Sequence, residues 1–268
     1  MVGSGSIRVL DGSTLCATGT DGVVIMNNET MTVDGGSLTL VDASLPNGTV
    51  DGGSLTLTGA SRITASSISL ANGGHLTLDG PKVIASGAWT TDVNEDNPYH
   101  AQLKGPGKTL VKTSTDASLL TVKNGATFYF GTTSNDFAIP DTVVEDGGSY
   151  AVCDAGRMQG TATDVRTITL NGGSIDLTSG FDGTFAYSKK TDTMKILIGE
   201  KGGTIGSTTS RTGRYVSSDN INLNVAVEDA TPADADGGTF RIDCGMSFTP
   251  TAKWSLKGPL ALADAFVN

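Results

Sequence analysis

Apolar and polar positions alternate with a period of two through much of the chain, in short runs separated by glycine-rich turns. One pattern occurs three times, as Asp34-Gly-Gly-Ser-Leu-Thr-Leu40, Asp51-Gly-Gly-Ser-Leu-Thr-Leu57 and Asn72-Gly-Gly-His-Leu-Thr-Leu78. Asp or Asn followed by two glycines tolerates the positive φ of a tight turn. Leu-Thr-Leu places two leucines on one face of a strand and the threonine on the other. Each copy therefore predicts a turn followed by a short strand.

The spacing of the copies indicates stacked units. Leu38 and Leu55 are 17 residues apart, and Leu55 and Leu76 are 21 residues apart. A period near twenty with small variations is typical of repeats that accept insertions in their loops. A single copy cannot bury its leucines, whereas stacked strands can, so we expect these three leucines to lie above one another. The apolar positions between the copies are expected to form the other walls of the stack: Val33, Leu45, Val50, Ile63, Ile68 and Leu70.

The same pattern divides the chain into regions. Residues 1–6 have the composition of an added linker, and residues 7–268 are expected to form a single all-β domain. Within it the clearest repeats span residues 31–85, a loop insertion covers 86–104, and looser repeats fill 105–268. The later turn before Ile175-Asp-Leu177 is Asn171-Gly-Gly, which has the same turn-then-strand order as the opening copies.

Composition supports a β-rich protein and argues against some partners. The 268 residues include 36 glycines and are only 6% aromatic, and no stretch has helical periodicity. A net charge of −10 disfavours nucleic acid as a partner, because phosphate binding requires a basic surface. No apolar run is long enough to span a membrane, so we expect no membrane insertion. Cys16, Cys153 and Cys244 lack the spacing of a metal or redox site and are expected to be buried.

The segment Gly53-Ser-Leu-Thr-Leu-Thr-Gly-Ala-Ser-Arg-Ile-Thr64, followed by Ile68-Ser-Leu70 and the third copy of the repeat, resembles the passenger-associated transport repeat of bacterial autotransporters. The resemblance covers roughly residues 31–80 and, in part, 143–180. It implies a right-handed parallel β-helix (solenoid) on the extracellular or outer-membrane surface of a Gram-negative bacterium. It further implies a secreted or surface-displayed adhesin or structural stalk. The motif contains no catalytic residue that the resemblance could transfer.

The insertion contains the most promising residues for ligand binding. Acidic and aromatic side chains lie close together there, and such groups bind sugars by stacking on the ring and accepting hydroxyl hydrogen bonds. The expected partner is a host or extracellular glycan, or a surface protein. The alternative is that the aromatic side chains pack the loop onto the stack. The candidate binding residues are Trp89, Asp92, Asn94, Glu95, Asp96, Tyr99 and His100.

A calcium site in the insertion is a weaker hypothesis. Asp92, Asn94 and Asp96 place oxygen atoms at alternate positions, as the first half of an EF-hand loop does. However, the sixth position is Asn97 rather than Gly, and the twelfth is Leu103 rather than Glu. We therefore expect a solvated loop and no required cofactor.

The sequence predicts no catalytic centre, because no group of acid, base and electrophile is present beyond what the repeat explains. The alternative is a polysaccharide-active β-helix enzyme, a lyase or a glycoside hydrolase, since such enzymes need clustered carboxylates on one face. In that case Asp92, Glu95 or Asp96 would act. Asp234 and Asp236 precede two glycines, a pattern that favours a turn over a ligand site.

Overall fold

The computed structural model contains strands and turns, and no helix, in the residues that it describes. These residues are 7–18, 24–25, 31–45, 48–63, 67–85, 90–92, 102–104, 110–113, 118–130, 137–138, 140–152, 158–159, 166–177, 184–185, 194–206, 221–223, 226–243, 246–248 and 254–262. The chain is therefore all-β, as its composition predicted.

Two sheets of ten strands each form the main walls. Sheet B contains β2 (Thr14–Thr18), β5 (Ser37–Val41), β8 (Ser54–Thr58), β11 (His75–Asp79), β16 (Leu119–Lys123), β19 (Asp141–Glu145), β22 (Arg166–Asn171), β25 (Met194–Ile198), β28 (Ala226–Asp229) and β31 (Trp254–Ser255). Sheet C contains β3 (Val24–Ile25), β6 (Ala43–Leu45), β9 (Arg62–Ile63), β12 (Ile84–Ala85), β17 (Thr127–Phe130), β20 (Ser149–Val152), β23 (Ser174–Leu177), β26 (Gly203–Gly206), β29 (Phe240–Asp243) and β32 (Leu260–Leu262).

The third wall is divided into three shorter sheets. Sheet A contains β1 (Ile7–Leu10), β4 (Met31–Asp34), β7 (Gly48–Asp51), β10 (Ser67–Ala71) and β15 (Leu110–Thr113). A two-stranded sheet follows, of β18 (Phe137–Ala138) and β21 (Met158–Gln159). A three-stranded sheet completes the wall, of β24 (Thr184–Phe185), β27 (Ile221–Leu223) and β30 (Met246–Phe248). Among the described strands, β15 does not pair with β18, nor β21 with β24.

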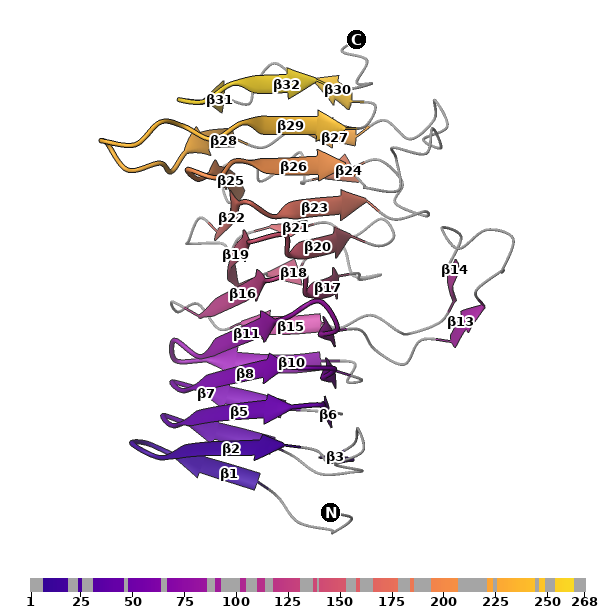
Figure 1. Cartoon of the computed structure of the whole chain (residues 1–268), viewed down its shortest axis with the longest axis vertical. Helices are drawn as coiled ribbons and strands as arrows, with labels where there is room; N and C mark the ends of the chain where they lie inside the picture. The colour runs from indigo at the N-terminus through magenta and orange to yellow at the C-terminus, as the bar shows by residue number, and fades with distance from the viewer. Residues whose placement is uncertain are drawn as a thin grey trace.

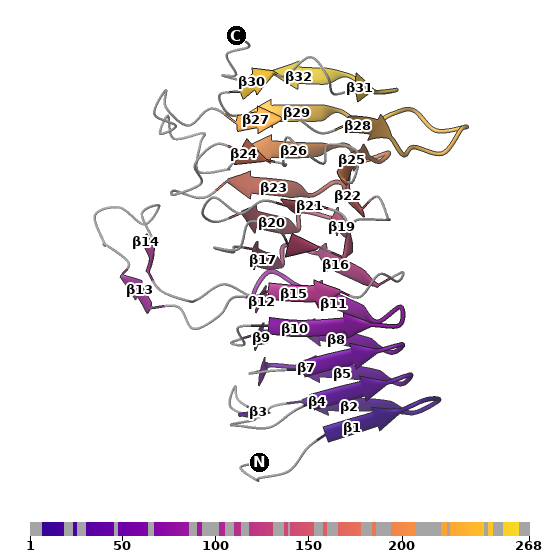
Figure 2. The same ribbon diagram turned by 180° about the vertical axis from the view of Figure 1, so that it is seen from behind.

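One third-wall strand, followed by one strand of sheet B and one of sheet C, forms a repeating unit. Within each sheet, the strands pair in parallel, and each strand pairs with the corresponding strand of the next unit along the chain. Figures 1 and 2 show the units stacked along the longest axis, from the N-terminal strands at one end to β30, β31 and β32 at the other. Parallel strands of this kind need crossover connections, which the other two walls provide. The arrangement is consistent with a parallel β-helix.

The expected leucine ladder is present. Leu38 lies opposite Leu55, and Leu55 lies opposite Leu76, in the register of β5, β8 and β11. All three side chains are buried, while Thr39 and Thr56 between them remain partly exposed. The six apolar residues expected in the other walls are buried as well: Val33, Leu45, Val50, Ile63, Ile68 and Leu70. The alternation of the sequence thus identified the core of the first units correctly.

The later copy of the turn motif is followed by a strand, as expected, but it lies at a different corner from the opening copies. Asp34-Gly-Gly connects a strand of sheet A with one of sheet B, whereas Asn171-Gly-Gly connects a strand of sheet B with one of sheet C. Both turns need positive φ, 72° at Gly35 and 94° at Gly172. The same local sequence satisfies either corner, because turn chemistry specifies the bend and not the wall that follows.

The expectation of buried cysteines is wrong for the one cysteine that can be tested. Cys16 is a free thiol and is exposed. It lies on β2, the edge strand of sheet B, opposite Thr39, which belongs to the outward-facing row. An outward position on an edge strand has no covering layer, so the side chain remains in solvent. Cys153 and Cys244 lie outside the described residues.

Candidate functional site

The predicted binding loop is described only at its base. Asp92 lies at the end of β13 (Thr90–Asp92), which pairs in antiparallel fashion with β14 (Gln102–Lys104), and Asp92 is opposite Gln102. Figures 1 and 2 show these two strands set apart from the stacked sheets. The interpretation of the insertion as a segment that leaves the stack is consistent with this position, although the two strands at its base were not expected. The other candidates lie outside the described residues: Trp89, Asn94, Glu95, Asp96, Tyr99 and His100.

A second candidate, which the sequence reasoning missed, lies on the outer face of sheet C. Ile175 in β23 and Ile242 in β29 point into the core. Because side chains alternate along a strand, their charged neighbours Asp176, Arg241 and Asp243 point outward. We call the outward polar residues of these neighbouring strands the sheet C patch: Ser149, Ser174, Asp176, Thr204, Arg241 and Asp243. The register aligns Ser149 with Ser174, Ser174 with Thr204, and Thr204 with Arg241, so the patch crosses four strands.

Asp176 is the most perturbed carboxyl group of the patch. Its Oδ2 accepts a hydrogen bond from the hydroxyl of Ser149, and Ser174 donates to it as well. Its Oδ1 is buried and has no hydrogen-bond partner among the described residues. Burial raises the pKa of Asp176, and the two serine hydrogen bonds lower it by less. The side chain is thereby shifted toward the protonated form, which is the form that a general acid requires.

Arg241 and Asp243 form an ion pair on β29, two strands away from Asp176. Nη2 of Arg241 lies 3.5 Å from Oδ2 of Asp243. The carboxylate side chain is only 5% exposed, whereas the guanidinium side chain is 39% exposed. Nε of Arg241 is buried without a hydrogen-bond partner among the described residues. The cation compensates the buried carboxylate and leaves part of the guanidinium available to solvent.

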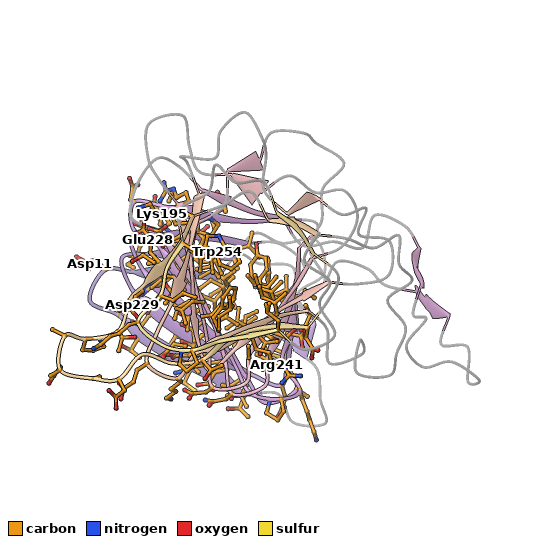
Figure 3. The ribbon with its side chains drawn as sticks, turned by 90° about the horizontal axis from the view of Figure 1, so that it is seen from above. Asp11, Lys195, Glu228, Asp229, Arg241 and Trp254 are labelled. Atoms are coloured by element: carbon orange, nitrogen blue, oxygen red, sulfur yellow. The ribbon has the colours of Figure 1, made fainter. Side chains whose placement is uncertain are left out.

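Asp176 and Asp243 lie two strands apart on the same outer face of sheet C. β23 and β29 are separated by one strand, so the Cα atoms of Asp176 and Asp243 are about 9.6 Å apart, which is two strand spacings. Inverting glycoside hydrolases hold the carboxyl groups of their acid and base about 6.5 to 9.5 Å apart, and side chains that lean toward each other from this Cα separation would fall in that range. Figure 3, which looks along the stack, shows Arg241 on a different side from the Lys195–Glu228 pair of sheet B.

The sequence carried a weak signal for this patch. Ile175-Asp-Leu177 and Phe240-Arg-Ile-Asp243 each place a charged residue at the outward position of an alternating strand. That pattern alone is common on solvated faces. The informative property is burial on the outer face, where Ala151 and Asp243 are 2% and 5% exposed.

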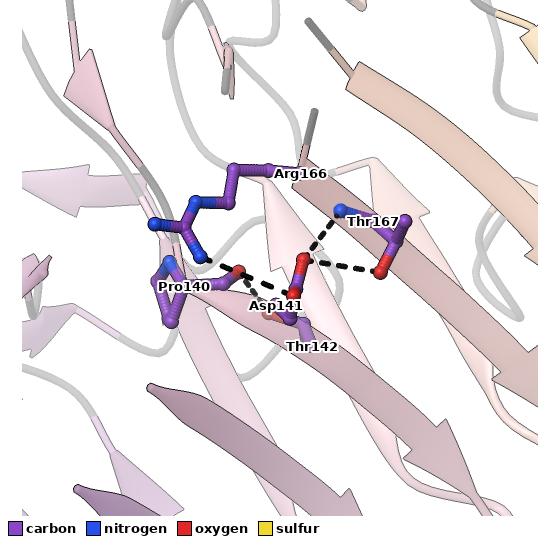
Figure 4. A network of polar contacts seen from close by, with 5 residues as sticks. All are labelled: Pro140, Asp141, Thr142, Arg166 and Thr167. Atoms are coloured by element: carbon purple, nitrogen blue, oxygen red, sulfur yellow. Dashed lines mark hydrogen bonds and ion pairs between the residues drawn. The ribbon is translucent and has the colours of Figure 1, made fainter. Parts of the chain in front are cut away.

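A partly buried polar network between β19 and β22 is structural rather than a site (Figure 4). Oδ1 of Asp141 accepts hydrogen bonds from the backbone N–H of Thr167 at 2.8 Å and from its hydroxyl at 3.1 Å. Nη1 of the buried Arg166 lies 3.9 Å from Oδ2 of Asp141, and the hydroxyl of Thr142 donates to the carbonyl of Pro140. Arg166 and Thr142 occupy inward rows of sheet B, whereas Asp141 and Thr167 occupy outward rows, so the network joins two units from both faces of the wall.

No three His, Cys, Asp or Glu side chains are grouped closely enough to hold a metal ion in the described part of the chain. The same residues include no helix that is long and apolar enough to cross a membrane.

Comparison of the chain with family models, with curated proteins and with solved structures finds no match.

Proposed function

We propose that this chain is a secreted or surface-displayed protein of the autotransporter-passenger kind, a right-handed parallel β-helix that serves as an adhesin or structural stalk. The observation that carries the proposal is the unbroken register of sheets B and C, each of which extends through ten strands. Ten strands at about 4.8 Å give a shaft about 43 Å long. Crossover connections between parallel strands of one sheet are right-handed in about 98% of cases, which supports the proposed hand.

A stack of units provides length and a broad face without a demanding active site. Insertions between strands then become recognition loops. The proposed partner is a host or extracellular glycan or a surface protein, and the proposed location is the surface of a Gram-negative bacterium. No cofactor is part of this proposal.

The display function can be tested directly. The chain would be fused between a secretion signal and an autotransporter translocator, with an epitope at its N-terminal end. Antibody labelling of intact cells is expected, together with resistance of the stack to added protease. Retention of the folded chain in the periplasm would contradict the proposal.

The binding function requires a separate experiment. A glycan array and a panel of matrix proteins would be probed with the intact chain and with a variant in which residues 87–101 are replaced by a short Gly/Ser linker. Binding that is lost in the folded variant supports the insertion as the recognition loop. If neither form binds any glycan or matrix protein, the adhesin proposal fails and a spacer role remains.

A second candidate function is cleavage of a polysaccharide at the sheet C patch. The specific observation in its favour is that a carboxyl group of raised pKa, Asp176, and a second carboxylate, Asp243, lie two strands apart on one outer face, as an acid and a base on either side of a sugar would. Asp176 would protonate the leaving oxygen, and Asp243 would activate water. Arg241 would contact an acidic sugar.

The enzymatic candidate predicts turnover that depends on both carboxyl groups. Acidic and neutral polysaccharides would be incubated with the intact chain and with Asp176→Asn, Asp243→Asn and the control Asp236→Asn, which alters an exposed turn. Loss of reducing-end release in the first two variants, and not in the control, supports the site. Activity that survives in both variants, or its absence from the intact chain on every substrate, removes this candidate. The possibility that Asp92, Glu95 or Asp96 acts instead is tested by the same assay on the loop-replaced variant.

A further inference from the structure

One described corner between sheets B and C is much longer than the others. β28 ends at Asp229, and β29 begins at Phe240. The connection, which we call the projecting loop, extends away from the stack in Figures 1 and 2. Pro232, Ala233, Asp234 and Asp236 in it are exposed. The loop lacks an apolar core of its own, so polar contacts must fix its conformation.

Lys257 makes those contacts from the next unit. Its Nζ donates hydrogen bonds to the backbone carbonyls of Pro232 at 3.2 Å and Ala233 at 3.3 Å, and to that of Ala235. The Ala235 N–H also donates to the carbonyl of Pro232 at 3.1 Å, which closes a turn around the ammonium group. The base of the loop is held separately, because the Phe240 N–H donates to the carbonyl of Pro259 at 2.9 Å.

The geometry matches the chemistry of a primary ammonium group. Lysine carries three N–H donors and no acceptor, and three carbonyl oxygens converge on it here. The charge is not matched by a carboxylate, since no described ion pair includes Lys257, although Asp234 and Asp236 lie in the same loop. Hydrogen bonds from a charged donor are stronger than those between neutral groups. Backbone carbonyls are therefore the groups that select the cation.

We propose that the projecting loop is a carbonyl cradle for a primary ammonium cation, which Lys257 fills within the same chain. Occupation of the cradle holds residues 230–239 in one conformation against the last unit. In the absence of the lysine side chain, the same three carbonyls bind a small alkylammonium ion. This inference is independent of the proposed surface display and of the sheet C patch.

Hydrogen exchange tests the first part. Lys257→Met keeps most of the aliphatic side chain and removes the charge and the donors. The Ala235 amide is the probe, because its hydrogen bond lies within the turn, and the amides of β28 and β29 report whether the stack remains folded. Loss of the charge-assisted bonds should speed exchange at Ala235 about tenfold or more, while exchange in the two strands remains as before.

Chemical rescue tests the identity of the ligand. Lys257→Ala would be measured with n-propylammonium chloride and, at equal ionic strength, with tetramethylammonium chloride, which has a charge and no N–H donor. Slow exchange should return with n-propylammonium alone. Lys201→Met is the matched control, because Lys201 lies on a corner of the same edge and binds the carboxylate of Asp146 instead of carbonyls. Unchanged exchange in Lys257→Met, or equal rescue by both ions, would overturn the proposal.

Discussion

Nδ2 of Asn124 donates a hydrogen bond to Oδ1 of Asp79 at 2.6 Å, although 45 residues separate them. Lys123 lies 3.6 Å from the same carboxylate. The insertion at residues 86–104 falls between the two partners in the sequence, yet β11 and β16 pair directly over five residues. The stack therefore continues across the insertion without a break.

Replacement of residues 87–101 by a short Gly/Ser linker should leave the fold intact. The pairing of β11 with β16 does not use these residues, and a shorter loop costs slightly less closure entropy, about 0.6 kcal/mol for each halving of its length. Circular dichroism and urea denaturation of both forms provide the measurement. A loss of β signal in the variant would mean that the insertion is part of the folding unit.

Shortening a leucine of the buried ladder should lower the free energy of unfolding far more than shortening a threonine of the adjacent outward row. Leu55 is buried between Leu38 and Leu76, so Leu55→Ala should lower the free energy of unfolding by about 2 to 5 kcal/mol. Thr56→Ala, at the adjacent outward position, should change it by about 0.5 kcal/mol or less. Denaturant titrations of the two variants make the comparison, and similar losses would contradict the assigned faces.

The repeated copies made this part of the fold predictable from sequence. Three occurrences of Leu-Thr-Leu specify both the strand and its inward face, and stacking then follows from the need to bury the leucines. The wall that follows Asn171-Gly-Gly was not predictable, because a turn motif contains no information about what the next strand packs against. Asp176 was missed for a related reason: alternation predicts that it points outward, but its burial depends on residues distant in sequence.

Addition of one methyl group should disrupt the turn of the second copy. A Cβ atom at Gly53 would lie 2.5 Å from the carbonyl oxygen of Gly36 and 2.7 Å from Cγ1 of Val33. Because one of these neighbours is backbone of the adjacent unit, Gly53→Ala should cost about 1 to 3 kcal/mol. Gly147 is a useful contrast, since a Cβ there meets nothing within 4 Å and only its φ of 77° opposes alanine. In thermal unfolding, Gly53→Ala should have a lower Tm than Gly147→Ala.

The raised pKa of Asp176 predicts a specific pH dependence. Because burial raises its folded-state pKa above the usual 3.8, the group stabilises the folded state below about pH 3.8 and loses that contribution as pH rises through the folded-state pKa. Asp176→Asn removes the titration, so the stability of the variant relative to the intact chain should increase with pH across this interval. Urea midpoints from pH 3.5 to 7 would show this trend. A difference that is constant with pH would contradict the assignment of the shift to Asp176.

The third wall is divided, and the connections between sheet C and this wall vary most in length. Sheets B and C run through all ten of their strands, and most corners between them are short, as from Asn171 to Ser174. The connections that leave sheet C range from a few residues to the long stretches between Ala85 and Leu110 and between Gly206 and Ile221. A foreign peptide inserted for display should therefore be placed after a sheet C strand, where the chain already contains long connections. Because each unit has one such position, a stack of more units can display more copies of the peptide.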